Sequence, residues 1–236
     1  MFQQIVPVNK DRHAGKKILP VSDFRFAAKD HIAYLTLHEF VRAASTYPVL
    51  FLEDKANDNF RPVALLGLTA GENAFVGEDG QWQGGYIPAI IRRYPFALSQ
   101  SGEDDRFLVC IDEASEFLSD TEGLPLFDEE GNATQVIENV KTYLGELQQM
   151  DRLTTEFTRF LVQNNLLTPL NMRVNVNEQV RNITGCYVVN EERLSNFSDQ
   201  KFLEVRQQNF LPAIYAHLLS LTQIERLAKL QPPARS

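Results

Sequence analysis

The 236-residue sequence is poor in the residues that most often carry catalysis and metal binding. It contains four histidines, two cysteines and one tryptophan. It also has no Gly-x-Ser-x-Gly segment, no phosphate loop ending in Gly-Lys-Ser/Thr and no His-Glu-x-x-His segment. These are the linear signatures of serine hydrolases, P-loop nucleotide-binding proteins and zinc peptidases. The sequence therefore names no reaction.

Long apolar runs and positive charge are also scarce. No stretch approaches about 18 uninterrupted apolar residues, so no membrane-spanning helix is encoded. Residues 1–10 lack the basic start and apolar core of a secretory signal, which makes the cytoplasm the expected location. Lys and Arg number 23 against 31 Asp and Glu, a net charge of −8. This balance argues against nucleic acid or an anionic membrane as a partner.

The cysteines and histidines favour structural roles. Cys110 and Cys186 each lie in an apolar stretch, so we expect reduced, buried thiols, with a single bridge between two distant strands as the alternative. His31 and His38 are seven residues apart, whereas a metal-binding pair on one helix is usually four apart. His217 falls in an apolar helical pattern and is expected to be hydrogen-bonded in the interior. No metal and no other cofactor is expected.

The first half of the chain alternates short apolar or β-branched runs with turns. These runs predict strands at residues 4–8, 49–53, 63–68, 74–76 and 107–111. Apolar residues at helical spacing predict a short helix over residues 37–45. The Tyr47-Pro48 step ends it, because the residue before a proline avoids the α region.

The second half carries longer helical patterns. Apolar residues recur at three-or-four spacing over residues 134–166, which predicts an amphipathic helix of roughly 50 Å if it is unbroken. That length is large for a domain of this size, so we expect a break near Gly145 or Asp151.

Two strands and a second helical region complete the pattern. Residues 172–177 alternate strictly and residues 185–189 are apolar, which predicts two strands joined by a turn at 182–185. Helix begins again near Ser198 and Asp199, a good N-cap followed by an acidic first turn. Pro212 predicts a kink or a fresh helix start.

These elements predict an α+β fold, with a strand-rich N-terminal half containing short helices. Long amphipathic helices of the C-terminal half would pack on a mixed or antiparallel sheet. We expect residues 1–230 to form a single domain and residues 231–236 to be a flexible tail. A domain boundary near residue 131, where the character of the sequence changes, is the alternative.

Residues 74–96 combine turn-forming residues, aromatic residues and an arginine pair. An Asp79-Gly80 turn predicts a hairpin, and Pro88 and Pro95 bracket a short helix. Trp82, Tyr86, Arg92, Arg93 and Tyr94 are the candidate ligand-binding residues, since a guanidinium binds carboxylate or phosphate and the rings offer flat walls. Adjacent helical residues diverge, so at most one arginine should face any pocket. Alternatively, the aromatic residues fill the core and one arginine pairs with an acidic residue.

The segment Phe-Val-x-x-Asp-Gly-x-Trp-x-x-x-Tyr-Ile-Pro-Ala-x-Ile-Arg-Arg-Tyr-Pro-Phe over residues 75–96 resembles the signature of the bacterial SapC-like proteins. Further similar segments occur in the same order at residues 47–51, 64–68, 108–112, 185–190 and 215–221. The resemblance covers about residues 1–230. It implies an accessory role near surface-layer or outer-membrane systems, and it supplies no catalytic residue.

Three functions remain open from the sequence. The leading hypothesis is a binding protein for a peptide, a protein partner or a small anionic-aromatic ligand. The alternative is an enzyme whose site is assembled from scattered residues, such as Asp112 and Glu113 with His38 or Arg92. A third hypothesis is a structural subunit whose two long helical regions pair into a homodimer or dock onto a larger assembly.

Overall fold

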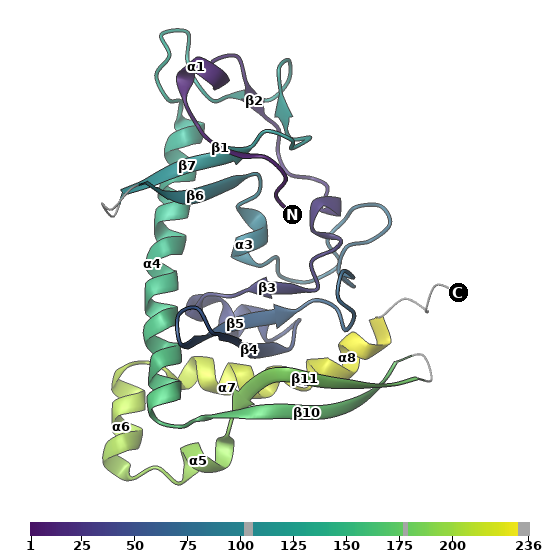
Figure 1. Cartoon of the computed structure of the whole chain (residues 1–236), viewed down its shortest axis with the longest axis vertical. Helices are drawn as coiled ribbons and strands as arrows, with labels where there is room; N and C mark the ends of the chain where they lie inside the picture. Colours follow the sequence, from purple (N-terminus) through teal and green to yellow (C-terminus); the bar gives the residue numbers. More distant parts are fainter. Residues whose placement is uncertain (102–105, 177–178, 231–236) are drawn as a thin grey trace.

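The computed structural model describes residues 1–101, 106–176 and 179–230. Its longest element, α4 (Gln135–Gln163), runs along one side of the molecule and connects its two ends (Figure 1). The helix is continuous over 29 residues, which corresponds to roughly 43 Å at the standard rise per residue. The predicted break at Gly145 or Asp151 is therefore wrong.

The packing of α4 explains why it stays intact. Gly145 is exposed, and a Cβ placed there would meet nothing within 4 Å. An exposed helical glycine costs only about 1 kcal/mol relative to alanine. Against this cost, α4 buries Leu144 at one end and Phe157 and Leu161 at the other, and each such side chain contributes about 1.5–3 kcal/mol.

In the described residues the strands form three antiparallel sheets, which confirms the predicted α+β class and its strand-rich first half. The largest sheet has the order β10-β11-β4-β5-β3, with strands Leu167–Val176, Gln179–Val189, Val49–Asp54, Asn59–Leu65 and Ile32–Tyr34. The second has the order β1-β7-β6, with strands Ile5–Pro7, Arg106–Asp112 and Phe96–Ser101. The third joins β8, β2 and β9, with strands Leu118–Ser119, Lys17–Ile18 and Leu124–Pro125.

Strands β10 and β11 form one long hairpin, paired from Leu167 and Val189 to Val176 and Gln179. Residues 182–185 lie inside β11, so the turn predicted there is wrong. Gly185 has φ of +79° beside a register shift in the β10–β11 pairing. The Thr-Gly sequence therefore marks a β-bulge. A bulge of this kind, like many turns, needs a residue with positive φ, which glycine adopts readily.

The remaining helices are short, and their boundaries follow local signals. Ser198 caps α6 by accepting a hydrogen bond from the backbone N–H of Lys201, and Pro212 lies in the first turn of a new helix, α7. Both predictions are confirmed. The residues of the predicted tail, 231–236, lie outside the described part. The short helices are α1 (Lys10–His13), η1 (Arg25–Ala27), η2 (Leu37–Glu39), α2 (Phe40–Ala43), α3 (Ala89–Arg92), α5 (Glu191–Ser195), α6 (Asp199–Gln207), α7 (Leu211–Ser220) and α8 (Gln223–Leu230).

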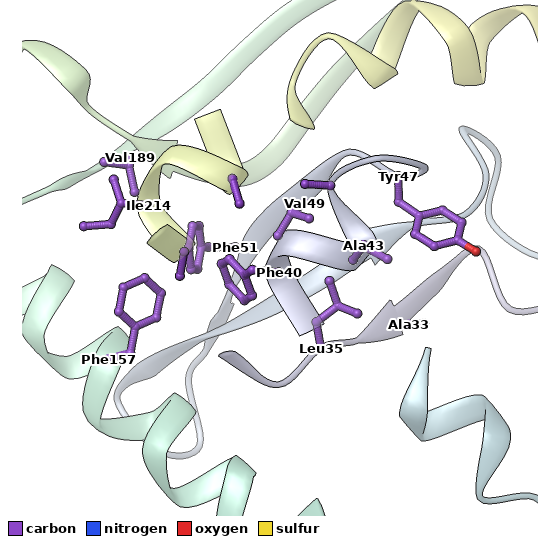
Figure 2. Close-up of a cluster of buried hydrophobic side chains, with 14 of the residues drawn as sticks. Ala33, Leu35, Phe40, Ala43, Tyr47, Val49, Phe51, Phe157, Val189 and Ile214 are labelled. Atoms are coloured by element: carbon purple, nitrogen blue, oxygen red, sulfur yellow. The ribbon is translucent and has the colours of Figure 1, made fainter. Parts of the chain in front are cut away.

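The largest hydrophobic cluster lies where β4, α2, α4 and α7 meet (Figure 2). The Phe40 ring packs edge-on against Phe157 at 5.7 Å between centroids, and Ile214 completes the cluster from α7. Residues on both sides of position 131 share this core. A second cluster, around Ile111 and Leu144, lies between the β1-β7-β6 sheet and the N-terminal half of α4.

His217 joins two strands from within the first core. Its imidazole lies fully buried, with Nδ1 2.7 Å from the carbonyl oxygen of Val49 on β4. The backbone N–H of Val189 on β11 donates to Nε2 at 3.0 Å. The proton must therefore reside on Nδ1, which makes the ring neutral. Burial lowers the pKa of His217 to about 4 from 6.5, and the predicted structural role is confirmed.

The depressed pKa of His217 predicts acid sensitivity of the fold. Because the unfolded chain binds a proton near pH 6.5 and the folded chain does not, this contribution to stability is complete above that pH. It is lost progressively as the pH falls towards 4. Once the pH is below both pKa values, the total loss in the free energy of unfolding is on the order of 3 kcal/mol. Urea unfolding at pH 7.5 and pH 5 should show a smaller decrease for His217→Gln than for the native chain. Equal decreases in both proteins would contradict this assignment.

Both cysteines are buried and unpaired. Burial raises the pKa of the Cys110 and Cys186 thiols, as expected for structural thiols. None of the helices in the described ranges combines the length and the apolar character that a bilayer crossing requires.

Candidate functional site

A buried carboxylate positions the segment that the sequence singled out. Glu39, at the end of η2, is 5% exposed. Its Oε2 accepts hydrogen bonds from the N–H (2.8 Å) and the hydroxyl (3.0 Å) of Thr36. Its Oε1 accepts from the hydroxyl of Tyr86 at 2.8 Å and from the N–H of Ala89 at 2.7 Å. Four donors thus satisfy the buried charge and tie the first residue of α3 to η2.

Trp82 and Tyr86 belong to the same hydrogen-bonded network. The indole N–H of Trp82 donates to the carbonyl of Tyr86 at 3.0 Å and to the hydroxyl of Tyr47 at 2.9 Å. The Tyr47 hydroxyl in turn donates to that Tyr86 carbonyl. The Trp82 ring packs edge-on against Phe24 and stacks on Phe75. Trp82 therefore holds the loop in shape with its polar group directed inward.

The predicted hairpin and short helix are present, and they place the two arginines. Val76 and Trp82 form an antiparallel bridge around the turn at Gly80, whose φ is +79°. Pro88 is the N-cap of α3, and Arg92 is the last helical residue. Burial, with the Glu39 charge as a lesser cause, raises the pKa of Tyr86 to about 12, so its hydroxyl stays protonated as a donor.

Arg92 is exposed and engaged with neutral groups. Its Nε donates to the carbonyl of Ile87 at 3.0 Å and its Nη2 donates to the Tyr86 hydroxyl at 3.3 Å. The guanidinium lies over the rings of Tyr86 and Tyr143, 5.6 and 5.8 Å from their centroids. The Tyr143 hydroxyl also donates to the carbonyl of Ala89, which fixes α3 against α4.

Arg93 has the most unusual environment of the candidate residues. Its side chain is half-buried, and its guanidinium lies 5.4 Å from the centroid of the Phe2 ring. Nε is buried without a hydrogen-bond acceptor among residues 1–101, 106–176 and 179–230. In these same ranges no carboxylate lies within 4.0 Å of the guanidinium. Burial lowers the pKa of Arg93, although an arginine stays charged under physiological conditions.

Tyr94 points into the interior. It is 6% exposed and stacks on Phe26 with 4.1 Å between ring centroids. Its hydroxyl is 3.4 Å from Asp112, and burial raises its pKa. Tyr94 is therefore a buried aromatic residue directly after the two arginines in the chain.

Two cavities meet at Arg93. The larger, about 380 Å³, lies between α4, η2, α3 and strands β6 and β7; we name it the Arg93 groove. Its apolar wall comprises Leu35, Ile90, Leu98, Phe107, Leu144 and Leu147. A second cavity, of about 270 Å³, is lined by both arginines and by Tyr94.

The predicted site is thus divided. Arg93 alone of the two arginines lines the Arg93 groove, as expected, but Arg92 and Arg93 share the smaller cavity. The expectation that at most one arginine faces any pocket is therefore wrong for the smaller cavity, although Arg93, the C-cap of α3, keeps helical backbone angles. Trp82 and Tyr86 are not among the described residues that line either of these two cavities.

The residues of the enzyme hypothesis lie in separate groups. Asp112 is fully buried, and its carboxylate accepts hydrogen bonds from the N–H groups of Gln3 and Gln4. Glu113 instead forms an ion pair with Arg12, and its Oε1 lies 3.2 Å from Nε2 of His13. The described part of the chain contains no group of three or more histidines, cysteines and carboxylates arranged to hold a metal.

Sequence reasoning missed the residues that organise this site. Glu39 was detectable, because Thr36-x-x-Glu39 is a capping-box sequence, and both of its reciprocal hydrogen bonds are present. The apolar wall of the groove had no comparable signal, since α4 and β6 come together only in the folded chain.

The fold and the site define an α+β protein with an apolar groove, at whose edge lies a half-buried arginine that has no ion-pair partner in the part of the chain that the structure describes. A family model described as SapC matches residues 8–227, so the chain belongs to the SapC family. Comparison with curated proteins and with solved structures finds no significant match.

The Glu39 network predicts a sharp stability effect. In Glu39→Gln one carboxylate oxygen becomes an amide NH₂ that faces two donors, so we expect a loss of about 3 kcal/mol in the free energy of unfolding. Glu138→Gln is the matched control, because Glu138 is exposed on α4 and forms an ion pair with the exposed Lys141; it should change stability by less than about 0.5 kcal/mol. If urea unfolding gives equal losses of stability for Glu39→Gln and Glu138→Gln, the Glu39 network does not stabilise the fold.

Proposed function

We propose that this SapC-family protein is a binding protein whose ligand presents a carboxylate to Arg93 and an apolar group to the Arg93 groove. The observation that carries this proposal is the half-buried guanidinium of Arg93 without a carboxylate partner in the described residues. Removing a charge from water is costly unless an opposite charge or hydrogen bonds replace the water. An anionic ligand supplies both.

The neighbouring side chains favour a carboxylate on an apolar body. The planar guanidinium matches the two oxygens of a carboxylate. The apolar wall formed by Leu98, Leu144 and Leu147 would exclude water and strengthen that contact. Glu39, a buried carboxylate of the groove lining, accepts four hydrogen bonds from protein donors and leaves Arg93 available.

The groove volume limits the size of the ligand. About 380 Å³ is at the lower end of the range of roughly 300–1,000 Å³ for small-molecule sites. This volume suits an arylcarboxylate or the last residues of a peptide with apolar side chains, the two ligand sources that share this chemistry. Trp82 and Tyr86 then contribute to binding indirectly, by fixing α3.

The proposal predicts that affinity depends on the negative charge of the ligand and on the positive charge of Arg93. Titration calorimetry with 3-phenylpropanoate and with the acetylated dipeptide Phe-Leu, each against its uncharged amide, should show binding of at least one acid. The amide should bind at least about tenfold more weakly. Arg93→Gln should weaken binding of the acid by a similar factor, and Arg93→Lys should give an intermediate affinity, because it retains the charge and loses the fork.

The matched control is Arg42→Gln, which removes the same charge from an exposed position on α2. Its affinity should equal that of the native protein. Equal affinities for acid and amide, or an unchanged affinity in Arg93→Gln, would overturn the proposal. The outcome with the two acids separates a small arylcarboxylate from a peptide terminus.

Three further features belong to the proposal. We infer a cytoplasmic accessory role, a connection to surface-layer or outer-membrane systems that follows the family resemblance, and self-association into a homodimer. Sedimentation of the purified chain over a range of concentrations tests the last of these.

A further inference from the structure

Another cavity, of about 240 Å³, lies where the β4–β5 hairpin meets the C-terminal half of α4. We name it the Asn59 pocket, after the residue in its lining whose side-chain oxygen is buried without a hydrogen-bond partner among the described residues. It adjoins the Arg93 groove, because Arg61 and Asp151 line both. Its chemistry is different, since polar side chains dominate its lining.

Asn59 is the first of the observations that point to a ligand. The residue is 7% exposed, and its Oδ1 has no hydrogen-bond partner in residues 1–101, 106–176 and 179–230. A buried amide left unpaired is destabilising, and the great majority of such groups in proteins are paired. A ligand that fills the pocket with a hydroxyl would give Asn59 the missing partner.

A threonine of α4 supplies a hydrogen-bond acceptor to the pocket. The Thr155 hydroxyl donates to the carbonyl of Asp151 at 3.0 Å, so its proton is committed to the helix. Thr155 is only partly buried, and the remaining lone pair on its oxygen can accept a hydrogen bond from a ligand. Thr158 also lines the pocket but is fully buried, with its hydroxyl donating to the carbonyl of Thr155 at 3.1 Å.

The charges that line the pocket cancel. Asp54 forms an ion pair with Arg61 at 2.6 Å. Asp151 and Arg159 add one charge of each sign, and neither has an ion-pair partner within 4.0 Å in the described ranges. A balanced set of donors and acceptors with no net charge favours a neutral ligand whose groups both donate and accept. Hydroxyl groups have this property.

Aromatic side chains provide apolar surface at the pocket. Tyr34 and Phe60 line it, and the Phe60 ring is held edge-on against Tyr187 with 4.7 Å between centroids. A flat apolar surface beside many hydrogen-bonding groups suits a ring that carries hydroxyls on its rim and C–H groups on its faces. The volume of about 240 Å³ is below the range of drug-sized sites, which limits the ligand to one such ring.

We propose that the Asn59 pocket binds a single neutral sugar ring, held by Asn59, Asp151, Arg159 and the hydroxyl oxygen of Thr155 on α4. This function is separate from carboxylate recognition at Arg93. The sugar can be free or the terminal unit of a larger molecule, since the pocket opens to solvent beside Asp151.

Saturation-transfer NMR with D-glucose, D-galactose, D-mannose and N-acetyl-D-glucosamine tests the proposal on the intact chain. At least one sugar should show transfer and bind in the millimolar range, as expected for a ligand of this size. Asn59→Ala should weaken its binding roughly tenfold or more. Asp151→Asn and Thr155→Val provide variants at positions that are not buried, so they retain a test if Asn59→Ala does not fold.

Asn175→Ala is the matched control, because this asparagine is exposed on β10 and does not line the pocket. It should bind the sugar as the native chain does, and so should Arg93→Gln. Absence of saturation transfer from all four sugars to the folded protein would overturn the proposal. Unchanged affinity in both Asp151→Asn and Thr155→Val would also overturn it. Failure of the carboxylate titrations at Arg93 leaves these outcomes unaffected, so the two proposals fail separately.

Discussion

The arrangement of the Arg93 region depends on the buried carboxylate of Glu39. A charge at this depth is tolerated only when hydrogen bonds replace its water. The donors come from three places along the chain, namely Thr36, Tyr86 and Ala89. Since Ala89 begins α3, the same carboxylate fixes the start of the helix that ends beside Arg93.

The second constraint is α4, which spans both hydrophobic clusters. Leu144 belongs to the cluster under the β1-β7-β6 sheet, and Phe157 belongs to the cluster under the largest sheet. One continuous helix therefore sets the distance between the two sheets. The Arg93 groove and the Asn59 pocket both lie along this helix and meet at Asp151, so rigidity of α4 gives both sites a fixed wall.

The two proposals depend on a difference between buried polar groups that have hydrogen-bond partners and buried polar groups that lack them. Glu39, Asp112 and His217 have partners from several segments, and these contacts hold loops and strands together. The buried Nε of Arg93 and Oδ1 of Asn59 lack a partner among the described residues, and both side chains line cavities. Both proposals rest on these two atoms, because a polar group that lacks a partner beside a cavity can bind an outside ligand, whereas the paired groups stabilise the fold.

The sequence by itself determined the features that local chemistry controls. Apolar runs located β1, β4 and β7 and parts of β5, β10 and β11, whereas β3 and β6 were missed and residues 74–76 form only a bridge at Val76. Ser198 and Pro212 marked helix starts, and Asp79-Gly80 marked a turn. Local signals failed where packing outweighed them. The cost of exposed Gly145 was too small to break α4. Gly185 gave a bulge in place of a turn, because both use positive φ.

Only the tertiary structure decided how the candidate site is built. Trp82 and Arg93 lie eleven positions apart in the sequence, yet Trp82 directs its N–H into the interior while Arg93 lines the groove. Glu39 meets Ala89 across 50 positions, and no spacing rule links such residues. Local patterns encode the conformation of neighbouring residues, whereas the pairing of a buried charge depends on every segment that packs around it.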